Sequence, residues 1–167
     1  MIRVIIPLLA ALLLVTGCGP NHIDNFETLR FDEKSEILDT QENREVLEVL
    51  HAYRIALQNR ESENIESLIS DEYYENGGTT NTSDDDYGRT GLPTVLSRLE
   101  ERVKSVKLDI VVKDMKVQDD RAWVVFEYLW NYKYQVDDVP KWESGRDVNR
   151  IDLVRDDGGL WKITRGL

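Results

Sequence analysis

The sequence is poor in cysteine, in clustered basic residues and in long apolar runs. Its 167 residues include a single cysteine, Cys18, so the chain forms no internal disulfide. Runs of lysine and arginine are missing, and the formal charge of −11 argues against binding to nucleic acid, which requires clustered cations. The apolar segment at residues 4–15 is too short to span a bilayer as a helix.

What remains is the composition of a globular domain. Hydrophobic residues make up 41% of the chain and charged residues 32%, values that exclude wholesale disorder. The length is sufficient for one domain with a sizeable core and too short for two domains of ordinary size.

The first residues have the parts of an export signal. Arg3 supplies a short basic region, an apolar region follows, and small residues precede Cys18. The order Val15-Thr16-Gly17-Cys18 resembles the lipobox of bacterial lipoprotein precursors. That resemblance implies cleavage before Cys18 and acylation of its thiol, which would anchor the chain in a membrane. Lipidation also accounts for an unpaired cysteine in an exported protein, because it removes a reactive thiol.

The same resemblance sets expectations for charge and location. Removing the signal peptide, residues 1–17, takes away one arginine and no acid, so the mature charge becomes −12. Gly19 stands where an aspartate retains Gram-negative lipoproteins at the inner membrane, so we expect the outer membrane, facing the periplasm, in a Gram-negative organism. We interpret the polar residues 18–38 as a tether of up to about 70 Å, leading to a domain over residues 39–167. Three apolar side chains of the tether could dock on that domain: Phe26, Leu29 and Phe31.

The domain opens with predicted helices. Asp39, with Glu42 as its capping-box partner, predicts a helix N-terminus. A second helix is expected around Glu63–Ile69, and a third begins at Thr90 with Pro93 in its first turn. Apolar residues at helical spacing define the buried faces: Val46, Val49, Leu50, Tyr53, Ala56, Leu57, Ile65, Leu68, Ile69, Leu92, Val95, Leu96, Leu99 and Val103.

After the third helix the pattern changes to alternation, which predicts strands. We expect one hairpin from residues 106–117 and 121–134, and a closing pair from Gly145–Arg155 and Leu160–Leu167 joined by a DDGG turn. The acidic loop SDDDYG lacks carboxylates at the positions that a calcium loop requires, so we expect no metal there and no cofactor.

Three helices followed by a long antiparallel sheet resemble the nuclear transport factor 2-like superfamily, including its SnoaL-like branch. The resemblance covers roughly residues 40–167 and rests on NRESENIESLISDEYYENG, GLPTVLSRLEERV and the closing IDLVRDDGGLWKI. It implies an α+β fold in which three N-terminal helices pack against a strongly bent antiparallel sheet to form a cone. It also implies an internal pocket and a homodimer through the outer face of the sheet, features that many members have.

Alternation along residues 121–134 gives that pocket a lining. One face of this strand carries mostly aromatic side chains: Val124, Phe126, Tyr128, Trp130, Tyr132 and Tyr134. We interpret most of them as core and expect those nearest the end of the strand to line a cavity. The predicted pocket residues are Tyr128, Trp130, Tyr132 and Tyr134, whose flat rings suit a ring-bearing or lipidic ligand.

The sequence offers few residues for catalysis. His22 lies in the tether and His51 lies off the apolar face of its helix, so we expect no internal histidine base. Arg150 and Asp152 are two residues apart on a strand and share a face, which resembles the Arg-x-Asp element of limonene-type epoxide hydrolases. With Tyr132 they are the catalytic candidates, and an ordinary surface ion pair is the alternative.

These features leave three functions open. The leading hypothesis is a membrane-anchored, non-catalytic lipoprotein of the cell envelope whose cone binds a small apolar ligand or a protein partner. The second is an anchored SnoaL-like hydrolase or isomerase that uses Arg150, Asp152 and a pocket tyrosine. The third is an acidic envelope protein that caps a basic partner, which the mature charge of −12 favours.

Overall fold

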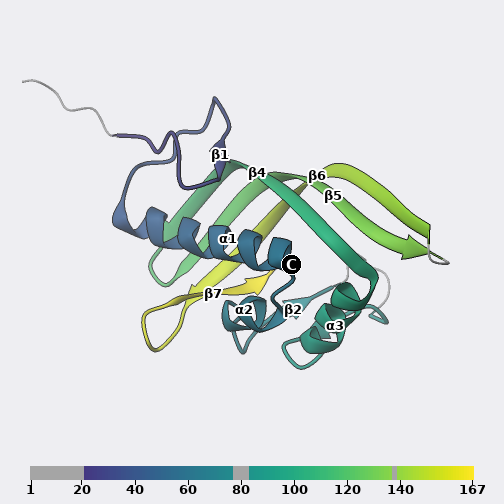
Figure 1. Ribbon diagram of the computed structural model, residues 1–167. Helices are drawn as coiled ribbons and strands as arrows, with labels where there is room; N and C mark the ends of the chain where they lie inside the picture. Colours follow the sequence, from purple (N-terminus) through teal and green to yellow (C-terminus); the bar gives the residue numbers. More distant parts are fainter. Residues whose placement is uncertain (1–20, 77–82, 137–138) are drawn as a thin grey trace, which may run out of the picture.

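Three helices pack on one face of a bent sheet in the computed structural model, which describes residues 21–76, 83–136 and 139–167 (Figure 1). The helices are α1 (Gln41–Asn59), α2 (Ser62–Ser67) and α3 (Leu92–Arg102). The strands are β1 (Arg30–Phe31), β2 (Tyr74–Glu75), β3 (Tyr87–Gly88), β4 (Val103–Gln118), β5 (Arg121–Val136), β6 (Val139–Arg155) and β7 (Trp161–Arg165). The predicted α+β class, with helices preceding a long antiparallel sheet, is confirmed.

The main sheet has the strand order β1-β4-β5-β6-β7, and every pair from β4 to β7 is antiparallel. β2 and β3 form a separate two-stranded pair. The register of β4 on β5 shifts between Val103 and Ser105 and again between Val112 and Asp114. Such bulges increase the local twist of a strand, so they help the sheet to curve around the helices. In Figure 1 the far ends of β5 and β6 extend well beyond α1.

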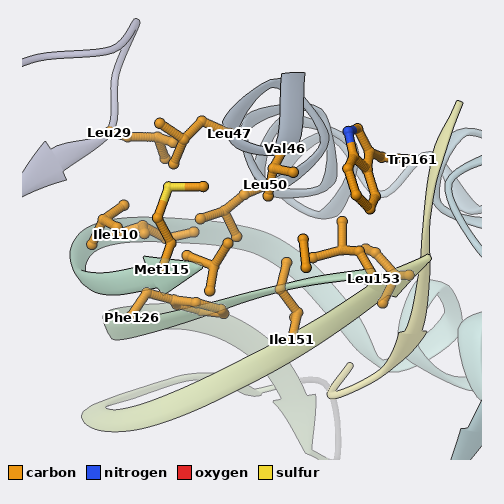
Figure 2. Packing of buried hydrophobic residues seen from close by; sticks show 14 of the residues in the cluster. Leu29, Val46, Leu47, Leu50, Ile110, Met115, Phe126, Ile151, Leu153 and Trp161 are labelled. Carbon is orange, nitrogen blue, oxygen red and sulfur yellow. The ribbon is translucent and has the colours of Figure 1, made fainter. Parts of the chain in front are cut away.

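The hydrophobic core lies between α1 and the sheet (Figure 2). Val46, Leu47 and Leu50 on α1 are completely buried. Helical spacing predicts Val46 and Leu50, whereas Leu47 was not predicted and the predicted Val49 is only partly buried. The three buried residues meet side chains from every long strand of the sheet, among them Ile110, Val112, Val124, Phe126, Ile151, Leu153 and Ile163. Burying each large aliphatic or aromatic side chain contributes about 1.5–3 kcal/mol, so this layer provides most of the stabilisation.

The starts of the first helix and of β6 differ from the predicted ones. Thr40, not Asp39, caps α1, and its hydroxyl oxygen accepts a hydrogen bond from the Asn43 N–H at 3.1 Å. Asp39 instead pairs with Arg44 at 2.6 Å. β6 begins at Val139, six residues before the expected start. The sequence pattern missed this part of the strand because residues 139–144 are exposed and carry no alternation of apolar and polar side chains.

The third helix also begins one residue later than predicted. Gly91 occupies the N-cap position in place of Thr90, without a side-chain hydrogen bond, and Pro93 lies in the first turn as expected. Of the apolar face of this helix, Leu92 and Leu96 are buried, whereas Val95 is exposed.

Residues 21–38 lie against the domain and do not form an extended tether. Of the three side chains that could dock, Phe26 and Leu29 are buried and Phe31 packs against the core. β1 pairs in parallel with Val111 and Val112 of β4. Four apolar side chains of this segment are buried: Ile23, Phe26, Leu29 and Ile37. Figure 2 shows Leu29 beside Leu47 of α1. These four residues have no regular spacing, so periodicity alone does not reveal that the segment is part of the core.

A buried arginine on α1 fixes the N-terminal segment to the sheet. The Arg54 side chain donates to the carbonyl oxygen of Leu108 at 2.6 Å and to the hydroxyl of Thr28. Arg54 therefore links three parts of the chain that are distant in sequence. The lipobox and Cys18 lie outside the described residues. Among the described residues, none of the helices α1, α2 and α3 is both long enough and apolar enough to cross a membrane.

Candidate ligand-binding cavity

A cavity of about 660 Å³ lies between the far half of the main sheet and the C-terminal ends of α1 and α3. α1 contributes Tyr53 and Leu57, and α3 contributes Leu99 and Arg102. The sheet contributes Val103, Val106, Leu108, Phe126, Tyr128, Trp130, Tyr132, Tyr134, Glu143 and Asn149, and Leu167 follows β7. This position corresponds to the interior of the cone, because the lining strand residues are on the face that packs against the helices.

From Phe126 to Tyr134, the even-numbered residues of β5 form a row of aromatic rings along one wall of the cavity. The rings of Trp130 and Tyr132 are stacked, with centroids 4.9 Å apart and an interplanar angle of 21°. Phe126 and Tyr128 are in tilted contact at 6.1 Å, as are Tyr132 and Tyr134 at 5.9 Å. The structure therefore places all four predicted pocket residues on the cavity wall, where alternation along the strand puts them.

A glycine on the neighbouring strand makes room for the central indole. Gly145 of β6 is directly opposite Trp130 of β5. A Cβ atom at position 145 would lie 2.5 Å from Cζ2 of Trp130, much closer than any van der Waals contact. Trp130 therefore lies across β6 at the only point on that strand where no side chain is in its way.

Two polar side chains of the cavity wall, Tyr132 and Asn149, donate hydrogen bonds within the protein. The Tyr132 hydroxyl donates to Glu143 at 3.0 Å, and the Asn149 amide donates to the carbonyl of Gly166 at 2.9 Å. Burial raises the pKa of Tyr53 well above its usual value, with smaller contributions from neighbouring tyrosines and Glu75. Burial also raises the pKa of Tyr128. Both hydroxyls therefore stay protonated and can donate a hydrogen bond to a ligand oxygen.

Groups for proton transfer are scarce in this cavity. Among its described lining residues there is neither aspartate nor histidine, and the one carboxylate side chain, Glu143, accepts the hydrogen bond from Tyr132. His51 lies elsewhere, with Nδ1 3.4 Å from the hydroxyl of Thr28 under the N-terminal segment. The described part of the chain also contains no group of three or more His, Cys, Asp or Glu side chains placed to hold a metal ion.

Arg150 and Asp152 share a face, as predicted, but it is the outer face of the sheet. Ile151 between them is completely buried, which turns its two neighbours away from the cone. The Arg150 guanidinium lies 2.7 Å from Asp152 and 5.0 Å from the ring centroid of Trp123. The sheet separates this pair from Tyr132, so the three catalytic candidates do not form one site.

Several lining residues were missed from the sequence as pocket residues. Tyr53, Leu57 and Leu99 were predicted only as buried helix positions, since helical spacing does not tell a core contact from a cavity wall. The sequence has no pattern that marks Arg102, Glu143 or Asn149 as cavity residues. Their position in the wall depends on how the sheet bends and where α3 packs against it.

Neither a family model nor a curated protein matches the sequence. Solved structures match its fold. A ketosteroid isomerase-like protein from Erwinia carotovora atroseptica SCRI1043 has a TM-score of 0.62 at 16% identity, over 76% of this chain and 94% of that chain. A candidate dehydratase of the nuclear transport factor 2-like family from Streptomyces avermitilis has a TM-score of 0.62 at 14% identity, over 74% and 92%.

A candidate scytalone dehydratase from Novosphingobium aromaticivorans DSM 12444 has a TM-score of 0.58 at 18% identity, over 75% of this chain and 80% of that one. At sequence identities this low, structural similarity shows that the fold is shared and not that the function is shared, because one fold supports many functions. The chain has the cone fold of nuclear transport factor 2-like proteins.

Proposed function

We propose that this chain is an exported, lipid-anchored protein of the cell envelope whose cone binds a small apolar ligand without converting it. The cavity is the observation that carries the proposal. Its volume of about 660 Å³ lies within the range of small-molecule sites, about 300–1,000 Å³. One wall is the aromatic row of β5, and aliphatic residues such as Leu57, Leu99 and Val106 form much of the rest.

The chemistry of the walls defines the ligand class. Flat aromatic surfaces opposite aliphatic side chains favour a ring-bearing or lipidic molecule, because apolar area removed from water contributes about 25 cal/mol per Å². The hydroxyls of Tyr53 and Tyr128 offer one or two hydrogen bonds to a ligand oxygen. A sugar phosphate would leave most of its polar groups without partners in such a cavity.

The proposal of binding without turnover rests on the groups available for proton transfer. General acid–base catalysis needs a titratable group within hydrogen-bond reach of the ligand. The described cavity wall provides tyrosines with raised pKa values and one carboxylate side chain, Glu143, which accepts a hydrogen bond from Tyr132. The isomerase and dehydratase names of the structural neighbours apply to those proteins. An enzyme built on Arg150, Asp152 and Tyr132 would need groups that lie on two faces of the sheet.

The proposal of a lipid anchor rests on the order of basic, apolar and small residues before Cys18. Several acyl chains together hold a protein on a bilayer, since each buried methylene contributes about 0.8 kcal/mol.

Ligand binding can be tested with a neutral naphthylamine dye, because Trp130 is the one tryptophan among the four in the chain that lines the cavity. The dye should quench tryptophan fluorescence saturably in the wild type. Trp130→Leu should abolish most of this quenching, whereas the control Trp142→Leu, at an exposed position outside the cavity, should preserve it. No saturable binding, or equal quenching in both variants, would contradict the proposal. Steady hydrolysis of an ester or epoxide that is lost in Glu143→Gln would show turnover instead.

A further inference from the structure

A second hollow, of about 370 Å³, lies on the outer face of the sheet, where β5, β6 and β7 run side by side. Three arginines from three different strands line it: Arg121 at the start of β5, Arg150 on β6 and Arg165 at the end of β7. We call this hollow the arginine groove. It contrasts with the cone interior, which aromatic and aliphatic side chains line.

The strand register explains why the three guanidinium groups share one groove. Trp123, Asp152 and Arg165 are direct neighbours across β5, β6 and β7. Arg121 is two residues before Trp123 on its strand, and Arg150 is two residues before Asp152. Residues two apart on a strand point to the same face about 7 Å from each other. The arginines therefore surround one central pair, Trp123 and Asp152.

The groove has an excess of positive charge in a strongly acidic protein. Within the described ranges, two carboxylates line the groove, Glu72 and Asp152, against three guanidinium groups. Asp152 pairs with Arg150 at 2.7 Å and, together with the ring of Trp123, holds that guanidinium in place. Arg121 and Arg165 have no ion-pair partner among the residues that the structure describes, although the chain has 32 acidic residues.

We propose that the arginine groove binds a phosphate group. Guanidinium groups recognise oxyanions through paired N–H donors, and arginine is favoured where phosphate is bound. Donors that come from three strands suit a tetrahedral anion with several oxygens better than a planar carboxylate, which one guanidinium can satisfy. The phosphate belongs to a soluble monoester or to a diester such as a lipid headgroup.

The test is calorimetric titration of the purified full-length chain in nonionic detergent at low salt, with inorganic phosphate as the first probe. Phosphate should bind saturably, and the double variant Arg121→Gln/Arg165→Gln should weaken binding at least tenfold. The control Arg146→Gln changes an arginine on the same face of β6 that is paired with Glu127 and lies outside the groove. It should leave the affinity unchanged.

Two further measurements test the role of the paired N–H donors and the source of the phosphate. If the double variant is misfolded by circular dichroism, Arg165→Lys keeps the charge but removes the paired donors, and it should still weaken binding severalfold. Phenyl phosphate and glycerophosphoglycerol then compare a monoester with a lipid-headgroup diester, and the tighter of the two identifies the source. The proposal is overturned if phosphate does not bind, if acetate competes equally well at the same ionic strength, or if Arg146→Gln weakens binding as much as the double variant.

Discussion

At the scale of single residues, the cavity depends on the absence of a side chain at Gly145. The ring of Trp130 occupies the space where a Cβ atom of residue 145 would be, and the neighbouring ring of Tyr132 stacks on that indole. A change at position 145 therefore acts on the ligand site through Trp130, although Gly145 itself offers a ligand nothing to bind. Glycine is required here by a close approach and not by its backbone angles.

We expect Gly145→Ala to move the indole of Trp130 and to reduce both stability and dye binding. The added methyl group would lie 2.5 Å from the ring, and overpacking of this kind costs about 1–3 kcal/mol. Urea unfolding and dye titration measure the two effects. Ser144→Ala, next along β6 on the opposite face, is the matched control and should be neutral. Unchanged stability and affinity in Gly145→Ala would show that the indole does not occupy this position.

At the scale of elements, the N-terminal segment of residues 21–38 is held by burial and by a small ion network. Lys113, in the second bulge region of β4, pairs with Asp32 at 2.9 Å and with Glu127 at 3.0 Å. The Lys34 N–H, and after it the Lys113 ammonium, hold the pKa of Asp32 below its usual value of 3.8. The bond to Lys113 likewise lowers the pKa of Glu127 from 4.5. Hydrogen bonds to Asp32 and Glu127 raise the pKa of Lys113 above 10.5.

These shifts predict that acid loosens the segment. A carboxylate with a lowered folded-state pKa stabilises the fold above its ordinary pKa, and this contribution is lost as the pH falls through the lower folded value. The raised pKa of Lys113 acts in the other direction and matters only above about pH 10. The network is therefore complete near pH 7, begins to weaken near the ordinary pKa values of 3.8 and 4.5, and is lost only below the lowered folded-state values.

Asp32→Asn should accordingly lower the urea midpoint at pH 7 and lower it less at pH 3, where part of the ion network has been lost. Asp24→Asn, an exposed acid in the same segment, is the control and should have little effect at either pH. A difference between wild type and Asp32→Asn of the same size at both pH values would mean that the ion network does not hold the segment.

The elements also show what could be predicted from the sequence. Helical spacing located α1, and strict alternation located β5 with the aromatic row that lines the cavity, because both patterns are repeated over many residues. Residues 21–38 gave no such pattern, since Ile23, Phe26, Leu29 and Ile37 are irregularly spaced. The sequence also could not predict that Arg150 and Asp152 lie on the outer face of the sheet. Alternation shows that two residues share a face but not which face covers the core.

At the scale of the whole molecule, the docked segment places the cavity relative to the proposed anchor. Three residues lie between Cys18 and His22, where the first bridge to Leu38 forms. The four steps along the chain from Cys18 to His22 span at most about 14 Å. The tether of about 70 Å expected from the sequence would have placed the domain far from the bilayer. β1 pairs with β4 at Val111, whereas the cavity reaches Val103, about 27 Å further along that strand. An anchored domain would thus lie close to the membrane with its cavity at the distant end.

This arrangement can be measured with the lipidated chain in vesicles, where an acylated Cys18 leaves any introduced cysteine as the only reactive thiol. A dye on Glu33→Cys, in the docked segment, should transfer energy to labelled headgroups more efficiently than the same dye on Trp142→Cys, near the start of β6. Cys18→Ser should abolish acylation and block removal of residues 1–17, both visible as mass. A mature wild-type protein with the mass of an unmodified chain would remove the anchor from the proposal. Equal transfer from both positions would retain the anchor but contradict the orientation. β1, which ends two residues before Glu33, pairs with Val111 and Val112 of β4, whereas Trp142 pairs with Lys133 of β5, which lies opposite Ser105 near the start of β4.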